Sequence, residues 1–140
     1  MQIKRLDHLV LTVKDIQASC AFYADILNIQ VSTFADNRTA LHFGQMKINL
    51  HQQGQEFEPK AKHPTPGSAD LCFIVEQTLD EVMAVLHQHN IPLELEPTSR
   101  TGACGKITSI YIRDPDNNLI ELLNYRIIQI NKFTRIIYCE

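Results

Sequence analysis

A long hydrophobic run, a leader segment and a cluster of basic residues are all missing from this 140-residue sequence. No apolar stretch approaches the roughly 20 residues that a membrane span requires. The opening residues, MQIKRLDH, lack the apolar core of a secretory signal. Lysines and arginines are scattered and the formal net charge is −3, which argues against a nucleic-acid partner. We therefore expect a cytoplasmic protein with neither a membrane nor a nucleic-acid partner.

Spacings typical of paired cysteines are missing as well. The four cysteines, Cys20, Cys72, Cys104 and Cys139, form no Cys-x-x-Cys motif. We expect them to be free thiols in a reducing compartment. The apolar fraction of 44% and the charged fraction of 21% are ordinary for a soluble globular chain, and the length predicts one domain.

The first half of the chain has the pattern of a strand, a helix and three further strands. LDHLVLTV predicts a buried strand, and spacings of three to four between apolar residues predict a helix from about 15 to 27, capped by Asp15. QVSTFAD and TALHFG predict two strands joined by a turn at NR, and QMKINLHQQ predicts another. The order is β-α-β-β-β.

The second half repeats this order after a loop with three prolines at 53–67. SADLCFIVE predicts a strand and LDEVMAVLHQHNI a helix; LELEP, KITSIYIRD and NLIELLNY predict three more strands. TSRTGACG is expected to be a loop, and DPDNN has the composition of a turn.

An internal repeat follows from these two halves. DHLVLTV (7–13) aligns with ADLCFIV (69–75), and INLHQ (48–52) aligns with IELLN (120–124). The alignment makes His8 equivalent to Asp70 and Asn49 equivalent to Glu121. We predict an α+β fold: one domain over 1–125, whose two βαβββ modules, at about 4–52 and 68–125, form an open half-barrel cleft. Residues 126–140 are a C-terminal extension, either an added strand or a disordered end.

The four equivalent residues are polar positions inside otherwise apolar strands, so their side chains could converge in the cleft. His51 lies two residues beyond Asn49 and faces the same way, whereas Asp7 is expected to face away. Each has a simpler structural interpretation. His8 and His51 could be hydrogen-bonded or exposed at strand ends, Asp70 could cap a turn, Asn49 could make a structural hydrogen bond, and Glu121 could face solvent.

The chain resembles the vicinal oxygen chelate superfamily in four features. They are the two modules, DH on the first strand, FYADILN on the first helix and DPDNNLIEL near the last strand. This superfamily contains glyoxalases, bleomycin resistance proteins and extradiol dioxygenases. More narrowly, ALHFGQMKINLH, EFEPKAKHPTPGS and RTGACGKITSIYIRDPDNNLIE are similar to glyoxalase domain-containing protein 5 and its bacterial relatives. The resemblance covers roughly residues 4 to 125 and implies a homodimer.

The resemblance also implies a divalent metal at the positions of His8, Asn49, Asp70 and Glu121. The chain has Asp70 where glyoxalases have His, and Asn49 where they have Glu. The implied ligands are therefore His8, Asp70 and Glu121, an oxygen-rich set that suits Mn²⁺ or Mg²⁺, or weakly held Zn²⁺, Ni²⁺ or Fe²⁺.

The expected activity is that of a metal-dependent glyoxalase- or dioxygenase-type enzyme. It would chelate two oxygens of a small oxygenated metabolite and transfer a proton. Glu121 or His51 would move that proton, and Asn49, Arg100 and Lys106 would contact the substrate. The alternative is a metal-free protein that binds and sequesters a small molecule on the same scaffold.

Overall fold

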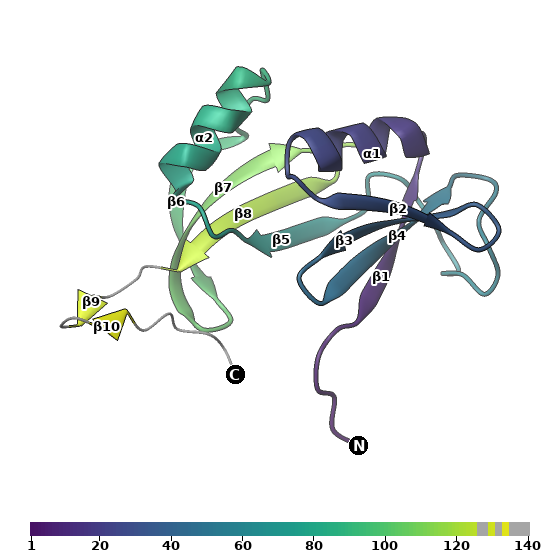
Figure 1. Ribbon diagram of the computed structural model, residues 1–140, viewed down its shortest axis with the longest axis horizontal. Coiled ribbons are helices and arrows are strands. Elements are labelled where there is room, and N and C mark those ends of the chain that lie inside the picture. The colour runs from purple at the N-terminus through teal and green to yellow at the C-terminus, as the bar shows by residue number, and fades with distance from the viewer. Residues whose placement is uncertain (126–128, 131–132, 135–140) are drawn as a thin grey trace. The chain divides into compact units, whose positions relative to one another are not determined.

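The computed structural model describes residues 1–125, 129–130 and 133–134 (Figure 1). Its contacts divide the chain into two compact units. The first unit is Met1–Ala69 together with Asp114–Asn118, and the second is the rest of the described chain. We describe each unit by itself.

The first unit is a four-stranded sheet with one helix. Its elements are β1 (His8–Val13), α1 (Ile16–Asp25), β2 (Gln30–Phe34), β3 (Arg38–Phe43) and β4 (Met46–Gln52). The strand order is β1-β4-β3-β2; β1 pairs parallel with β4, and the other pairs are antiparallel. The predicted β-α-β-β-β order is confirmed.

Capping and burial explain the helix of this unit. The Asp15 side chain accepts hydrogen bonds from the Gln17 and Ala18 backbone N–H groups at 2.8 and 3.1 Å, which satisfies two donors that the helix leaves open. Phe22 and Tyr23 are buried, and α1 contacts β2, β3 and β4. The predicted cap is confirmed.

The turn between β2 and β3 differs from the expected one. Three residues, 35–37, connect Phe34 to its partner Arg38, and two of them, Asp36 and Asn37, have φ angles of 58° and 60°, a left-handed conformation that Asp and Asn tolerate. Arg38 was placed in the turn by the sequence pattern, but it is the first residue of β3, opposite Phe34. Its side chain is therefore fixed by the sheet.

The second unit has the same order. Its elements are β5 (Asp70–Ile74), α2 (Leu79–Gln88), β6 (Leu95–Gly102), β7 (Gly105–Arg113) and β8 (Leu119–Tyr125), with strand order β5-β8-β7-β6. Thr78 and Glu81 form a capping box at the start of α2. The α+β class and the two βαβββ modules are confirmed.

Strand β6 is longer than the sequence pattern predicts. The register of β6 against β7 shifts between Leu95 and Thr98, around Pro97, which has no N–H to donate to the ladder. Pairing then continues to Gly102 opposite Gly105. The predicted loop TSRTGACG is therefore mostly strand and hairpin, and Arg100 projects from a paired strand.

The DPDNN turn between β7 and β8 belongs to the first unit. Tyr23 Oη donates to Asp114 Oδ2 at 2.9 Å, and the Asp116 carboxylate accepts from the Lys14 backbone N–H at 3.2 Å. Asn118 Oδ1 accepts from the Ala69 backbone N–H at 2.8 Å. Asn117 adopts φ 67°, as expected for an Asn in this turn. The turn is thus held by buried polar groups.

Three further expectations can be compared with the structure. Cys20 and Cys72 are free thiols as predicted, whereas Cys104 is disulfide-bonded, so the prediction of a free thiol there is wrong. In the C-terminal extension, β9 (Gln129–Ile130) pairs antiparallel with β10 (Phe133–Thr134); Cys139 and the rest of 126–140 lie outside the described residues. No helix in the described part of the chain is long and apolar enough to cross a membrane.

Candidate functional site

The register of the two sheets reproduces the internal repeat. His8 opens β1 and Asp70 opens β5. Two residues further along these strands, Val10 lies opposite Asn49 and Cys72 lies opposite Glu121. Because side chains two apart in a strand share a face, each unit carries its polar pair on one face of its sheet. The equivalences of His8 with Asp70 and of Asn49 with Glu121 hold at the level of strand register.

A carboxylate orients the imidazole of His8. His8 Nδ1 lies 2.8 Å from Asp7 Oδ1, and this hydrogen bond is the main cause that lowers the pKa of Asp7. The interpretation that Asp7 faces away is wrong, because Asp7 precedes the first paired residue of β1 and the alternation of a strand does not apply to it. The contact leaves Nε2 as the ring atom that can bind a ligand.

His51 is the buried imidazole of the first unit. It is only 8% exposed, and burial, followed by the charge of Arg38, lowers its pKa; nearby Glu56 opposes this effect. Its ring meets that of Phe57 edge-on at 5.5 Å. His51 lines one cavity of about 480 Å³ and another of about 140 Å³. It is therefore neutral at pH 7 and able to accept a proton.

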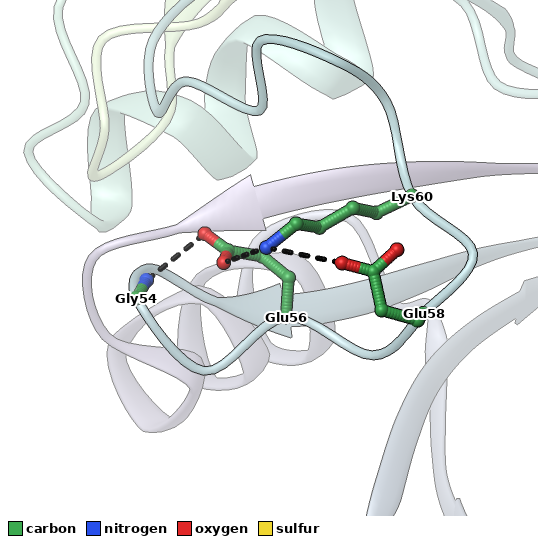
Figure 2. A network of polar contacts seen from close by, with 4 residues as sticks. All are labelled: Gly54, Glu56, Glu58 and Lys60. Atoms are coloured by element: carbon green, nitrogen blue, oxygen red, sulfur yellow. Dashed lines mark hydrogen bonds and ion pairs between the residues drawn. The ribbon is translucent and has the colours of Figure 1, made fainter.

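The loop beside His51 is ordered by an ion-pair cluster (Figure 2). The Glu56 carboxylate accepts from the Gly54 backbone N–H at 2.9 Å and from Lys60 Nζ at 3.1 Å. Lys60 Nζ also lies 3.7 Å from a carboxylate oxygen of Glu58. These contacts hold the pKa of Glu56 at about 2, with the Gly54 hydrogen bond as the largest cause. Lys60 lines the larger cavity, but its positive charge is already balanced there by the carboxylates of Glu56 and Glu58.

Glu121 is the central polar residue of the second unit. It lies on β8 between Cys72 of β5 and Tyr111 of β7, its direct partners in the two neighbouring strands. All three line a cavity of about 440 Å³. Burial raises the pKa of Cys72 to about 12, and the charge of Glu121, its hydrogen bond with the thiol and the charge of Asp70 add to the effect. The thiol is therefore a donor to the carboxylate, not a nucleophile.

Arg100 and Lys106 were both expected to contact a substrate, but the structure separates them. Arg100 lines the cavity of Glu121 and donates from Nε to Tyr111 Oη at 3.1 Å. Lys106 precedes Ile107, which also lines the cavity, so the alternation of β7 directs Lys106 to the opposite face of the sheet. Only Arg100 shares a cavity with Glu121.

The expected metal ligands are divided between the two units. His8 belongs to the first unit, and Asp70 and Glu121 belong to the second. Within the residues that the structure describes, no three His, Cys, Asp or Glu side chains form a group that could hold a metal ion. The convergence of His8, Asp70 and Glu121 on one cleft stays a prediction.

Three residues near these sites were missed by sequence reasoning: Arg38, Phe57 and Tyr111. Arg38 was hidden because its strand seemed to begin one residue later. Phe57 lies in the proline-rich loop, where no periodicity places it. Tyr111 could have been found, because it is the one aromatic residue of the strand next to that of Glu121 and carries a polar hydroxyl.

The fold is that of a known class. Residues 5–122 match the family model of the Glyoxalase/Bleomycin resistance protein/Dioxygenase superfamily. The chain belongs to this superfamily, and the predicted resemblance at this level is confirmed.

Particular relatives are similar over nearly the whole chain. Virulence protein STM3117 of Salmonella typhimurium strain LT2 is 56% identical over 125 residues, which are 89% of this chain and 87% of that protein. Its crystal structure matches with a TM-score of 0.88 over 90% of this chain and 100% of that chain. Glyoxalase domain-containing protein RDO1 of Mycosarcoma maydis is 49% identical over 126 residues, covering 90% and 71% of the two chains. An integron cassette protein from the mobile metagenome of V. cholerae is 50% identical, with a TM-score of 0.88 and coverages of 90% and 98%.

Proposed function

We propose that this protein is a metal-dependent enzyme of the superfamily that transfers a proton on a small oxygenated metabolite. The observation that carries the proposal is the position of Glu121. Its carboxylate lies in the middle of a sheet face, lines a cavity of about 440 Å³ and shares that cavity with the cationic side chain of Arg100. A carboxylate in a partly buried cavity is a suitable base, and a guanidinium beside it suits an anionic or oxygen-rich substrate.

The donor chemistry of His8, Asp70 and Glu121 supports the divalent metal that members of this superfamily often use. Asp7 holds the Nδ1 side of His8 at 2.8 Å, as carboxylates commonly do for metal-binding histidines. Asp70 and Glu121 share one sheet face, and among the described residues neither forms a salt bridge. Their negative charge therefore favours a cation there.

In this proposal His8, Asp70 and Glu121 hold the metal, whose identity we place among Mn²⁺, Ni²⁺, Zn²⁺, Fe²⁺ and Mg²⁺. A bound metal would act as a Lewis acid on two neighbouring substrate oxygens. Glu121 or His51 takes up and returns the proton, and Arg100 and Asn49 orient the substrate. A cytoplasmic homodimer close to glyoxalase domain-containing protein 5 is part of the same proposal, and sedimentation velocity tests its dimeric state.

The metal content of the purified protein tests this proposal. Protein prepared without chelators should retain about one divalent ion per chain, measured by elemental analysis. His8→Ala and Glu121→Gln should each lose most of it, because each removes one of three ligands. His87→Ala and Glu76→Gln are matched controls, since both side chains are exposed and lie outside the cavities. Both controls should keep the metal.

Proton transfer is tested on metal-loaded protein. Small 2-oxo and 2-hydroxy compounds are incubated with the loaded protein in deuterated buffer, and exchange of the carbon-bound hydrogen is followed by NMR. Exchange should require the metal and be lost in Glu121→Gln. A protein that retains none of the five metals would contradict the proposal and favour the metal-free binding alternative.

A further inference from the structure

A small cavity on the first unit is lined by two cationic side chains, Arg38 and Lys47. It has a volume of about 140 Å³, and its lining includes Phe34, Arg38, Lys47, Asn49 and His51. The register of β3 against β4 brings most of these side chains to one face of the sheet. Ala40 lies opposite Asn49, and His42 lies opposite Lys47. Arg38 is two residues from Ala40 and therefore shares that face. The cavity thus faces the same side of the sheet as His8 and His51.

Both cations of this cavity lie over aromatic rings instead of carboxylates. Arg38 Cζ is 4.5 Å from the centroid of the Phe57 ring, and Lys47 Nζ is 4.6 Å from that of Phe34. In the described part of the chain neither cation forms a salt bridge. A cation–π contact fixes a cation without neutralising it. The lining therefore favours an anion.

Two buried polar atoms of the cavity lining also have no hydrogen-bond partner. They are the donor Arg38 Nε and the acceptor Asn49 Oδ1. An unsatisfied buried polar atom is destabilising, so few persist in folded proteins without a reason. A donor and an acceptor left open in one cavity match a ligand that offers one acceptor and one donor.

We propose that this cavity binds a 2-hydroxy carboxylate. The carboxylate accepts from Arg38 Nε, the hydroxyl donates to Asn49 Oδ1, and Lys47 and the neutral ring of His51 face the ligand from β4. A cavity of about 140 Å³ has room for about five heavy atoms if each takes roughly the 30 Å³ of a water molecule, which is the size of glycolate. The proposal deepens the proposed function, on which it rests for the reaction, by naming the class of substrate.

Binding is measured on chelator-stripped full-length protein, so that it does not depend on a metal. The probes are glycolate, acetate and ethylene glycol; acetate lacks the hydroxyl and ethylene glycol lacks the carboxylate. Titrations followed by ¹H–¹⁵N NMR should show glycolate shifting the Arg38 Nε–Hε resonance and the Asn49 side-chain amide. Acetate should bind about tenfold more weakly, because it loses one hydrogen bond worth about 1.4 kcal/mol. Ethylene glycol should not bind.

Two variants separate the contacts. Arg38→Lys keeps the charge but removes the guanidinium donors, so glycolate should bind about tenfold more weakly or worse. Asn49→Leu removes the acceptor, so glycolate should then bind no better than acetate. Arg113→Lys is the matched control, because its exposed side chain pairs with Glu94 on the second unit, and it should bind glycolate like the wild type.

The outcomes distinguish this inference from the proposed function. Glycolate that leaves Arg38 and Asn49 unshifted, or that binds no better than acetate to wild-type protein, overturns the inference. The wild-type titration decides this even if a variant fails to fold. Failure of the proposed function alone appears differently: glycolate binding persists, but no metal is retained and no hydrogen exchange occurs.

Discussion

The thiol of Cys72 donates a hydrogen bond to the carboxylate of Glu121 from the neighbouring strand, where the two residues are direct partners. Burial, followed by the charge of Glu121 and this hydrogen bond, raises the pKa of the Cys72 thiol to about 12 and keeps a potential nucleophile protonated. The hydrogen bond also occupies part of the carboxylate that the proposed reaction uses. The chemistry of the two groups is therefore coupled.

Removing the charge of Glu121 should make Cys72 more reactive. Glu121→Gln removes a cause that raises the thiol pKa, so the thiolate fraction increases and alkylation by iodoacetamide at pH 9 should become about threefold to tenfold faster. Peptide mass spectrometry measures the rate at Cys72, with Cys20 as the internal reference. Glu76→Gln should leave the rate unchanged; an unchanged rate in Glu121→Gln would show that the carboxylate does not control the thiol.

Gly67 should tolerate no side chain. Its φ is +74°, and a Cβ there would lie 2.5 Å from the backbone oxygen of Asp116. Gly67→Ala should lower the free energy of unfolding by at least about 2 kcal/mol, because strain and a backbone clash add. Gly54→Ala is the control, since φ is +79° but nothing lies within 4 Å of its Cβ. Urea unfolding should show about 1 kcal/mol for this control, and equal losses would contradict the role of the clash.

Tyr23 should make the stability depend on alkaline pH. Burial, followed by the charge of Asp114 and their hydrogen bond, raises the pKa of Tyr23. The folded chain therefore holds the phenol proton more tightly than the unfolded chain, and this stability is complete below about pH 10 and is lost as the pH rises further. Tyr23→Phe should cost about 1 to 3 kcal/mol at pH 7 and flatten the decline above pH 10. Urea unfolding across pH 7 to 11 measures both; parallel curves for the two proteins would contradict the linkage.

Asp7 should strengthen metal binding through His8. Asp7→Asn removes the charge that orients the imidazole, so metal affinity should fall about tenfold or more. Competition with a fluorescent chelator measures the affinity. Asp25→Asn, an exposed change at the end of α1, should have no effect. Wild-type affinity in Asp7→Asn would remove Asp7 from the proposed site.

Much of the architecture was predictable because it depends on local patterns. The two alternating halves predicted two βαβββ modules, and Asp15 and the DPDNN turn were identified from capping and turn preferences. The errors lie where a local signal was weak. Arg38 seemed to belong to a turn, and Pro97 concealed the continuation of β6, because the hydrogen-bond ladder that fixes both strands depends on partners distant in the sequence.

The sequence by itself determined the class of fold, the internal repeat and the polar residues His8, Asn49, Asp70 and Glu121, because strand periodicity and turn chemistry are local properties. Tertiary structure decided which groups share a cavity. It placed Arg100 in the cavity of Glu121, directed Lys106 to the other face, and set Arg38 over Phe57. These contacts depend on strand register and on loop packing, which join residues that no local pattern connects.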